Sequence, residues 1–266
     1  MARLWVDTDI GTNVDDAVAL LAAVAHPSVE LVGVSTVGSD PERRAAVAVG
    51  LLASAGVDLG SVSVVAGAET AGGRAAEVVD AVAASGAESL LAIGPLTNVA
   101  ALTAAGVRPA ELTVMGGALR PVEHRGQLRS VEHNFASDPE AAATVLAVPG
   151  AVIVPLDATV ATRLDERLLV RLVAAAPVLE PMVQAWVAEW GEVFLHDPAA
   201  LLIAAGDGSE LARFERRRLR VEPDGGVIDG GPAASGTVHD VVTSLFGVAV
   251  VASVLALLAD LKLAGS

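Results

Sequence analysis

The sequence contains no cysteine and no tyrosine, and Lys262 is its only lysine. Without cysteine the chain forms no disulfides or thiolate metal sites, and it has no cysteine nucleophile. Aromatic residues make up only 3% of the sequence. Few side chains are therefore available to stack on a planar ligand.

Positive charge is also scarce. The chain has 17 Lys and Arg residues against 32 Asp and Glu residues, which gives a formal net charge of −15. Such a chain repels phosphate backbones, which excludes a general nucleic-acid binder. Hydrophobic residues reach 53%, which excludes a disordered chain. The length of 266 residues suits a single large domain spanning residues 1–266.

Two apolar stretches are candidates for a signal peptide or a membrane-spanning helix. The N-terminal run turns acidic at Asp7, too soon for a signal peptide. A longer run, 241–259, has no charged residue and could span a bilayer by length. It contains Thr243, Ser244 and Gly247 and has no basic flank before it, which favours a buried C-terminal helix. We therefore expect a cytoplasmic protein with no membrane partner.

Short β-branched and aliphatic runs alternate with alanine-rich stretches of helical length. Strands are expected at 4–6, 31–35, 62–65, 90–93, 112–114 and 152–154, and helices at 16–25, 41–55, 77–84, 98–105 and 139–146. Apolar strands separated by helices predict an α/β fold with an open, mostly parallel sheet and helices on both faces. Ligands of such sheets bind at the carboxyl ends of the strands.

Four aspartates follow the first expected strand: Asp7, Asp9, Asp15 and Asp16. An N-cap with a solvated turn would explain one of them but not four. Crowded carboxylates repel one another unless positive charge is shared between them. A helix N-terminus supplies part of that charge, and a divalent cation would supply more. Hard oxygen ligands suit Ca²⁺ or Mg²⁺, so this segment indicates a cation site.

Further polar segments follow other strands or precede helices: Gly94–Asn98, Met115–Gly117, Glu132–Phe135 and His196–Pro198. Asp138 and Pro139 form an ordinary helix start. Glu132 and Asn134 have no such evident capping role, which favours a functional interpretation. Together and in this order, the segments resemble the calcium-dependent, inosine–uridine-preferring nucleoside hydrolases. The resemblance extends from Leu4 to Pro198.

The resemblance implies a Rossmann-like nucleoside hydrolase fold. It further implies hydrolysis of the N-glycosidic bond of a ribonucleoside or related riboside to ribose and free base. The implied cofactor is Ca²⁺, the implied partner is a small-molecule riboside, and the implied assembly is a homodimer or homotetramer. Asp9 would bind Ca²⁺ and act as the general base toward water. Asp16, the Thr97 carbonyl and Asp197 would complete the calcium ligands, and His196 would protonate the departing base.

Other positions match residues that hold the sugar in the family. Asp15, Glu132 and Asn134 would contact ribose hydroxyls, Met115 would lie beneath the sugar, and Asp7 would support the acidic segment. This assignment is chemically coherent, because breaking the bond builds positive charge on the sugar ring, which carboxylates stabilise.

The match has departures. Two extra residues separate Asp9 from Asp15, and Ser39-Asp40 replaces a glycine–asparagine pair, leaving Asp40 as a candidate ribose contact. Gln127 is a doubtful counterpart of a family asparagine. The segment 66–76 lacks the histidine that lines the base pocket in many members. The calcium and ribose chemistry is therefore expected to be kept, while base recognition is expected to differ.

Aromatic candidates for the base pocket are Trp186, Trp190 and Phe194. The two tryptophans are four residues apart and share one helix face. Trp190 is a candidate lid over the leaving base, although packing in the core or in a dimer interface would also explain the pair. His124 lies in a polar loop near the expected pocket, and its role stays open.

Two other functions compete with the hydrolase. The strand followed by Asp7 and Asp9 also resembles the opening of haloacid-dehalogenase-type phosphatases, with Asp7 as the nucleophile. Such chemistry needs a lysine, and the chain offers only Lys262. The second alternative is a non-catalytic relative that binds ribosides or Ca²⁺.

Overall fold

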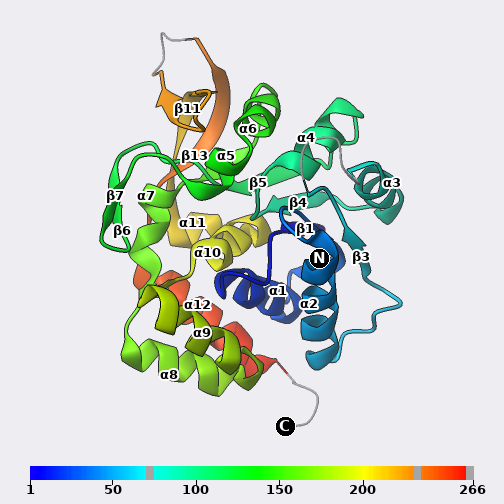
Figure 1. Ribbon diagram of the computed structural model, residues 1–266, viewed down its shortest axis with the longest axis vertical. Helices are drawn as coiled ribbons and strands as arrows, with labels where there is room; N and C mark the ends of the chain where they lie inside the picture. Colours follow the sequence, from blue (N-terminus) through cyan, green and yellow to red (C-terminus); the bar gives the residue numbers. More distant parts are fainter. Residues whose placement is uncertain (70–74, 231–234, 262–266) are drawn as a thin grey trace.

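The computed structural model describes residues 1–69, 75–230 and 235–261, so Lys262 lies outside the described residues. Its main sheet has nine strands in the order β12-β11-β13-β8-β5-β4-β1-β2-β3 (Figure 1). The strands are β1 (Ala2–Thr8), β2 (Val29–Thr36), β3 (Ser63–Ala66), β4 (Ser89–Ala92), β5 (Glu111–Met115), β8 (Val152–Val154), β11 (Ala212–Val221), β12 (Val227–Asp229) and β13 (Thr237–Leu245). All neighbours from β3 to β13 are parallel, whereas β11 pairs antiparallel with β13 and β12. The predicted open, mostly parallel sheet is confirmed.

Helices cover both faces of the sheet, as expected. One hydrophobic cluster includes α1 (Asp15–Ala25), α2 (Pro41–Ser54), α10 (His196–Leu202) and α12 (Gly247–Asp260). The other includes α3 (Ala75–Ser85), α4 (Thr97–Ala104) and α6 (Pro139–Leu146). Leu4 and Val6 of β1 belong to the first cluster and Trp5 to the second. This division follows the alternation of side chains along a strand.

The remaining elements of the described chain lie outside the main sheet and the helices named above. They are the hairpin β6 (Val122–His124) and β7 (Gln127–Arg129), α5 (His133–Ser137), α7 (Leu156–Thr159), η1 (Val160–Thr162), β9 (Arg163–Leu164), α8 (Glu166–Ala175), η2 (Pro177–Leu179), α9 (Glu180–Trp190), β10 (Val193–Phe194), η3 (Ile203–Asp207) and α11 (Gly208–Leu211). The hairpin lies at the left edge of Figure 1, and α9 lies below it beside α8.

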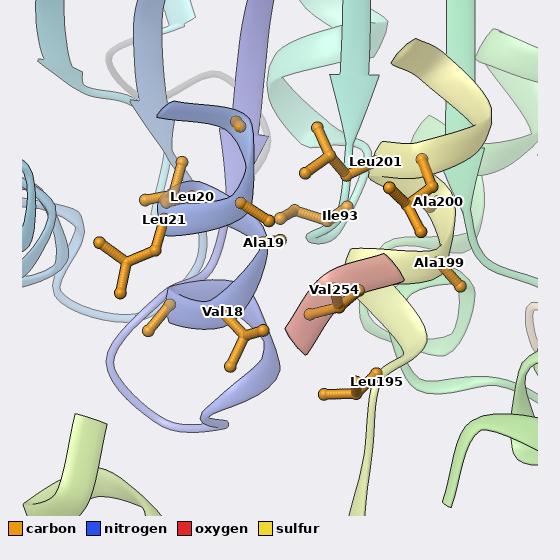
Figure 2. Close-up of a cluster of buried hydrophobic side chains, with 14 of the residues drawn as sticks. Val18, Ala19, Leu20, Leu21, Ile93, Leu195, Ala199, Ala200, Leu201 and Val254 are labelled. Atoms are coloured by element: carbon orange, nitrogen blue, oxygen red, sulfur yellow. The ribbon is translucent and has the colours of Figure 1, made fainter. Parts of the chain in front are cut away.

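Helix α1 packs against α10 over the β1 and β4 region of the sheet. Figure 2 shows Ile93 between Ala19 of α1 and Leu201 of α10. All of these side chains are buried. Small residues let the two helices approach closely, and close packing fixes their relative position. As a result, the N-terminal turns of α1 and α10 meet at the carboxyl edge of the sheet.

The apolar run 241–259 is not one helix, so that prediction is wrong. Its first part belongs to β13, where Val241 and Val242 pair with neighbouring strands, and α12 starts only at Gly247. A Cβ at position 247 would lie 2.0 Å from the Ala161 carbonyl oxygen, so the turn between the two elements requires glycine. Charge-free composition did not distinguish a buried strand from a buried helix. Within the described residues, no single helix is long and apolar enough to cross a membrane, although α8 and the 177–190 segment, bent by 118°, pass that test as a pair.

Candidate active site

The strand ends around the β1–β4 pair open into a cavity of about 460 Å³. The order β3-β2-β1-β4-β5 reverses direction at this pair, which is where ligands of doubly wound sheets bind. The sequence-predicted residues that line the cavity are Asp9, Asp15, Asp16, Met115, Glu132, Asn134, Trp190, His196 and Asp197. The structure thus brings together residues that lie as far apart in the sequence as Asp9 and Asp197. Asp40 and Thr97 do not line it.

Three buried carboxylates form the acidic centre of the cavity. Asp15 and Asp16 begin α1 and Asp197 lies in the first turn of α10, and one oxygen of each lies within 4.8 Å of the others. Burial raises the pKa of Asp15 to about 7. Burial and the neighbouring charges of Asp15 and Asp16 raise the pKa of Asp197 well above its usual range. This arrangement favours a bound positive charge.

The acidic centre fits a metal ion better than it fits helix capping. The N-cap residue of α1 is Val14, which makes no side-chain cap bond, so Asp15 and Asp16 are not caps. Asp15 Oδ1 is buried and has no hydrogen-bond partner in the part of the chain that the structure describes. Leaving a buried carboxylate oxygen unpaired costs free energy, and oxygen ligands of this kind suit a hard divalent cation. Asp15, Asp16 and Asp197 could therefore hold a metal ion.

Asp9 lies between the acidic centre and a buried arginine. It follows β1 and remains partly open to the cavity. Burial raises the pKa of Asp9, while the positive charges of Arg44 and His133 oppose the rise. Arg44 of α2 donates hydrogen bonds to the Ile10 carbonyl at 3.0 Å and to the Ser39 carbonyl at 2.8 Å. It therefore fixes the loops after β1 and β2 while adding positive charge near Asp9.

The sequence did not single out Arg44, because nothing distinguishes it from its exposed neighbour Arg43. Asp40 is also exposed and acts as the N-cap of α2, where it accepts a hydrogen bond from the Arg43 amide at 3.1 Å. Thr97 begins α4 and donates its hydroxyl to Asp138 Oδ2 at 2.6 Å. Both residues thus have local structural roles.

Asp7, Ser35 and Asn98 form a buried hydrogen-bonded cluster, the brace, at the start of the acidic segment. Asp7 Oδ1 accepts hydrogen bonds from Ser35 Oγ at 2.5 Å and from Asn98 Nδ2 at 2.7 Å. Asn98 also donates to the Thr36 carbonyl and accepts from the Ala68 amide. The brace thereby connects β1, β2, α4 and the loop after β3. Burial raises the pKa of Asp7 to about 7, although these hydrogen bonds oppose the rise.

Glu132 and Asn134 do have structural roles, so the expectation that they lack one is wrong. Glu132 is the N-cap of α5, and its carboxylate accepts hydrogen bonds from the Asn134, Phe135 and Gly117 amides. Asn134 Nδ2 donates to the carbonyls of Ile93 and Met115. These bonds hold α5 against the ends of β4 and β5. The pattern was missed because α5 is only a short helix with an unusual glutamate cap.

Two histidines meet at the other end of the cavity. His196 Nδ1 lies 2.7 Å from Thr159 Oγ1, and its Nε2 lies 3.2 Å from His124 Nε2. The Phe194 ring stacks on His196 with centroids 5.2 Å apart. Burial, together with the positive surroundings, holds the pKa of His196 well below its usual range. His196 is therefore a neutral imidazole near pH 7, held on both nitrogens. The structure also places His124, which the sequence left open, in the cavity.

Trp186 and Trp190 share one face of α9, as predicted, with ring centroids 5.7 Å apart. Trp186 is buried and donates its indole N–H to the Glu192 carbonyl, whereas Trp190 is 44% exposed. The guanidinium carbon of Arg125 lies 4.4 Å from the Trp186 ring centroid and 5.5 Å from that of Trp190. Arg125 lines the cavity, and no sequence signal pointed to it. Residues 70–74 of the segment without histidine lie outside the described residues.

Solved structures of similar shape are nucleoside hydrolases. An inosine–uridine-preferring nucleoside hydrolase from Bacillus anthracis has 18% identity and a TM-score of 0.78, covering 98% of this chain and 100% of that one. A purine-preferring ribonucleoside hydrolase from Gardnerella vaginalis has 20% identity and a TM-score of 0.77, covering 97% and 98%. An inosine–guanosine nucleoside hydrolase has 19% identity and a TM-score of 0.79, covering the full length of both chains. These likenesses confirm the nucleoside hydrolase fold.

No curated protein is significantly similar to the chain in sequence. The family model of the inosine–uridine preferring nucleoside hydrolases, however, matches residues 4–245, nearly the whole chain. This match leaves the phosphatase alternative without support. The chain belongs to the inosine–uridine preferring nucleoside hydrolase family and is a nucleoside N-ribohydrolase.

Proposed function

We propose that this enzyme hydrolyses the N-glycosidic bond of a riboside with the help of Ca²⁺ and an aspartate base. The observation that carries the proposal is the acidic centre, in which oxygens of Asp15, Asp16 and Asp197 lie within 4.8 Å of one another. Asp16 and Asp197 would hold the ion, and the family pattern adds Asp9 and the Thr97 carbonyl as further ligands. When bound, the ion would offset the repulsion among the carboxylates and acidify the attacking water.

Asp9 is the proposed general base. It is partly open to the cavity, and Arg44 and His133 oppose the rise of its pKa, which favours the ionised form that accepts a proton. Water oxygen attacks the anomeric carbon, Asp9 takes the water proton, and the C–N bond breaks with its electron pair passing to the base nitrogen. The acidic centre would stabilise the positive charge that develops on the sugar ring.

The remaining cavity residues would divide between the two halves of the substrate. Asp15 would contact ribose hydroxyls, together with Glu132 and Asn134, and Met115 would lie beneath the sugar. His196 would face the leaving base. Its imidazole is neutral near pH 7, and we infer that its Nε2 exchanges the contact with His124 for a hydrogen bond to the departing base. Asp40 is left out of this arrangement, because it is exposed and caps α2.

A reducing-sugar assay with inosine, uridine and nicotinamide riboside, run with and without a chelator, tests the proposal. We expect ribose release that a chelator abolishes and added Ca²⁺ restores. Calorimetric titration with Ca²⁺ should show one site in the wild type and none in Asp16→Ala or Asp197→Ala. Ribose release that is unaffected by chelation would contradict the role of the metal, and the absence of ribose from all three substrates would contradict the hydrolase.

A further inference from the structure

Arg125 has an unusual backbone conformation for an arginine. It occupies the two-residue turn between β6 and β7, where its φ is +54° and that of Gly126 is +68°. Turns with positive φ at both central positions usually carry Asn, Asp or Gly, because a larger side chain is strained there. Strained residues of this kind concentrate at functional sites. The turn holds the Arg125 side chain on the wall of the cavity.

Aromatic rings support the guanidinium group of Arg125, and the carboxylates of Asp15 and Glu192 lie near enough to stabilise its charge without a direct ion pair among the described residues. The guanidinium carbon lies 4.4 Å from the Trp186 ring centroid and 5.5 Å from that of Trp190. Its Nε is buried without a hydrogen-bond partner, and within residues 1–69, 75–230 and 235–261 it forms no ion pair. The nearby carboxylate of Glu192 is bound to Arg163 at 2.9 Å. Arg125 therefore keeps hydrogen-bond donor capacity for a ligand in the cavity.

Arg125 also faces the end of the cavity that the leaving base would occupy. The adjacent residue in the hairpin is His124, whose Nε2 contacts His196. Met115, Glu132 and Asn134, the proposed ribose residues, belong to the ends of β5 and the start of α5 instead. The cavity thus has an acidic centre for the sugar and a cationic, aromatic-backed wall for the base.

We propose that Arg125 binds a negatively charged substituent on the leaving base, so that the preferred substrates are ribosides of carboxylated bases. This inference rests on the proposed function, since it assigns the substrate class of the same site. A guanidinium fork matches a carboxylate with two parallel hydrogen bonds. The tryptophan faces that would stack a neutral purine are covered by Arg125 instead, in a chain with only 3% aromatic residues.

Matched substrate pairs test the inference. Nicotinic acid riboside and nicotinamide riboside differ only in a carboxylate against a carboxamide, and orotidine differs from uridine by one carboxylate. We expect wild-type kcat/KM to favour the acid of each pair by about tenfold or more, the gain of a charge-assisted hydrogen bond. Arg125→Gln should abolish this preference, Arg125→Lys should keep part of it, and the exposed Arg171→Gln on α8 should retain it fully.

Equal cleavage of acid and amide by the wild type, with the same ratio in Arg125→Gln, would overturn the inference while leaving the proposed hydrolase intact. A second measurement does not depend on turnover. Binding of free nicotinate should change the fluorescence of Trp186 and Trp190 in the wild type, and nicotinamide should bind at least about tenfold more weakly. If no riboside were cleaved, the proposed function would fail, and this titration would still decide the role of Arg125.

Discussion

The Nε2 atoms of His124 and His196 lie 3.2 Å apart, so a hairpin that follows β5 contacts the first turn of α10 inside the cavity. One of the two nitrogens must carry the hydrogen, because both imidazoles are neutral near pH 7. Burial and the nearby Arg125 lower the pKa of His124 to about 4, and that of His196 is also held low. His124 is therefore a positioning residue for His196.

His124→Ala should lower kcat by about tenfold, a fraction of what general acid–base catalysis contributes, while changing KM little. The reason is that His196 loses the partner that orients its Nε2. His124→Gln, which keeps a hydrogen-bonding group, should recover part of the loss. The two variants and the wild type are compared by steady-state kinetics on one riboside. A rise in KM without any fall in kcat would show that His124 binds substrate instead.

Asp9→Ala should lower kcat by about 10²- to 10⁴-fold, since it removes the proposed base. Asp9→Asn keeps the shape but not the proton acceptor, so it should be similarly inactive. Thermal unfolding should show that both variants fold, and the exposed Asp80→Asn on α3 serves as a control that retains activity. Ribose release by Asp9→Ala at a near wild-type rate would contradict the mechanism.

The metal-free protein should lose stability as the pH rises from about 4 to about 7. In the folded state the pKa of Asp15 is raised to about 7 from 3.8, so over this interval the native protein holds a proton that the unfolded chain releases. Stability rises with pH only where the unfolded state binds more protons, so here it falls. Asp16 and Asp197, the proposed calcium ligands, also have raised pKa values, so Ca²⁺ competes with their protons and its affinity should increase with rising pH.

Thermal unfolding at several pH values, with chelator and with Ca²⁺, measures both effects. The difference in melting temperature between the two conditions should be larger at pH 8 than at pH 5. Asp15→Asn, which cannot ionise, should reduce the pH dependence of the metal-free protein, and Asp7, whose pKa is also raised to about 7, should maintain the remainder. A metal-free melting temperature that is independent of pH in the wild type would contradict the assignment.

Trp190→Ala should raise KM by about tenfold, equivalent to ~1.4 kcal/mol of binding free energy. Trp190 is 44% exposed, lines the cavity and backs the Arg125 guanidinium, so its removal exposes that group to water. Val170→Ala, on a residue that is 70% exposed on α8, is the surface control. An unchanged KM in Trp190→Ala would argue against its contribution to the base pocket.

Gly33→Ala should destabilise the fold by about 1–3 kcal/mol, as overpacking of a core does. A Cβ at this position would lie 2.1 Å from Trp5 Cζ3, and Trp5 is fully buried. Gly50→Ala is the matched control in α2, where an added Cβ meets nothing within 4 Å. The control should stabilise the protein by about 0.5–1 kcal/mol. Urea unfolding of both variants compares the two, and equal stabilities would contradict the packing at Gly33.

The strand–helix alternation predicted most of the fold, because each buried parallel strand reads as a continuous apolar run. It also predicted a cation site at Asp15 and Asp16 after the first strand, whereas Asp197, which follows β10 outside the main sheet, is assigned to that site only by the family resemblance. Hydrophobicity gave a wrong prediction of one helix for residues 241–259. Val241 is in strand β13, and Val254 is in helix α12. Composition alone carries no information about which element a uniformly apolar run will form.

The cationic half of the cavity could not be predicted. His124 and Arg125 belong to a two-stranded hairpin whose sequence has no hydrophobic period, and their position depends on tertiary contacts with α9 and α10. Arg44 is likewise indistinguishable from Arg43 until the helix packs. The cap role of Asp40 was also not predicted, because a residue directly after a strand end can turn outward and cap the next helix.

The contact between the amide of Asp197 and Asp15 joins residues 182 positions apart in the chain. The acidic centre therefore forms only after the first and last thirds of the protein have docked through α1 and α10. Native contacts of such high sequence separation form late and slow folding. A ligand that bridges the two helices binds only the folded protein, so it shifts the folding equilibrium toward the folded state by mass action.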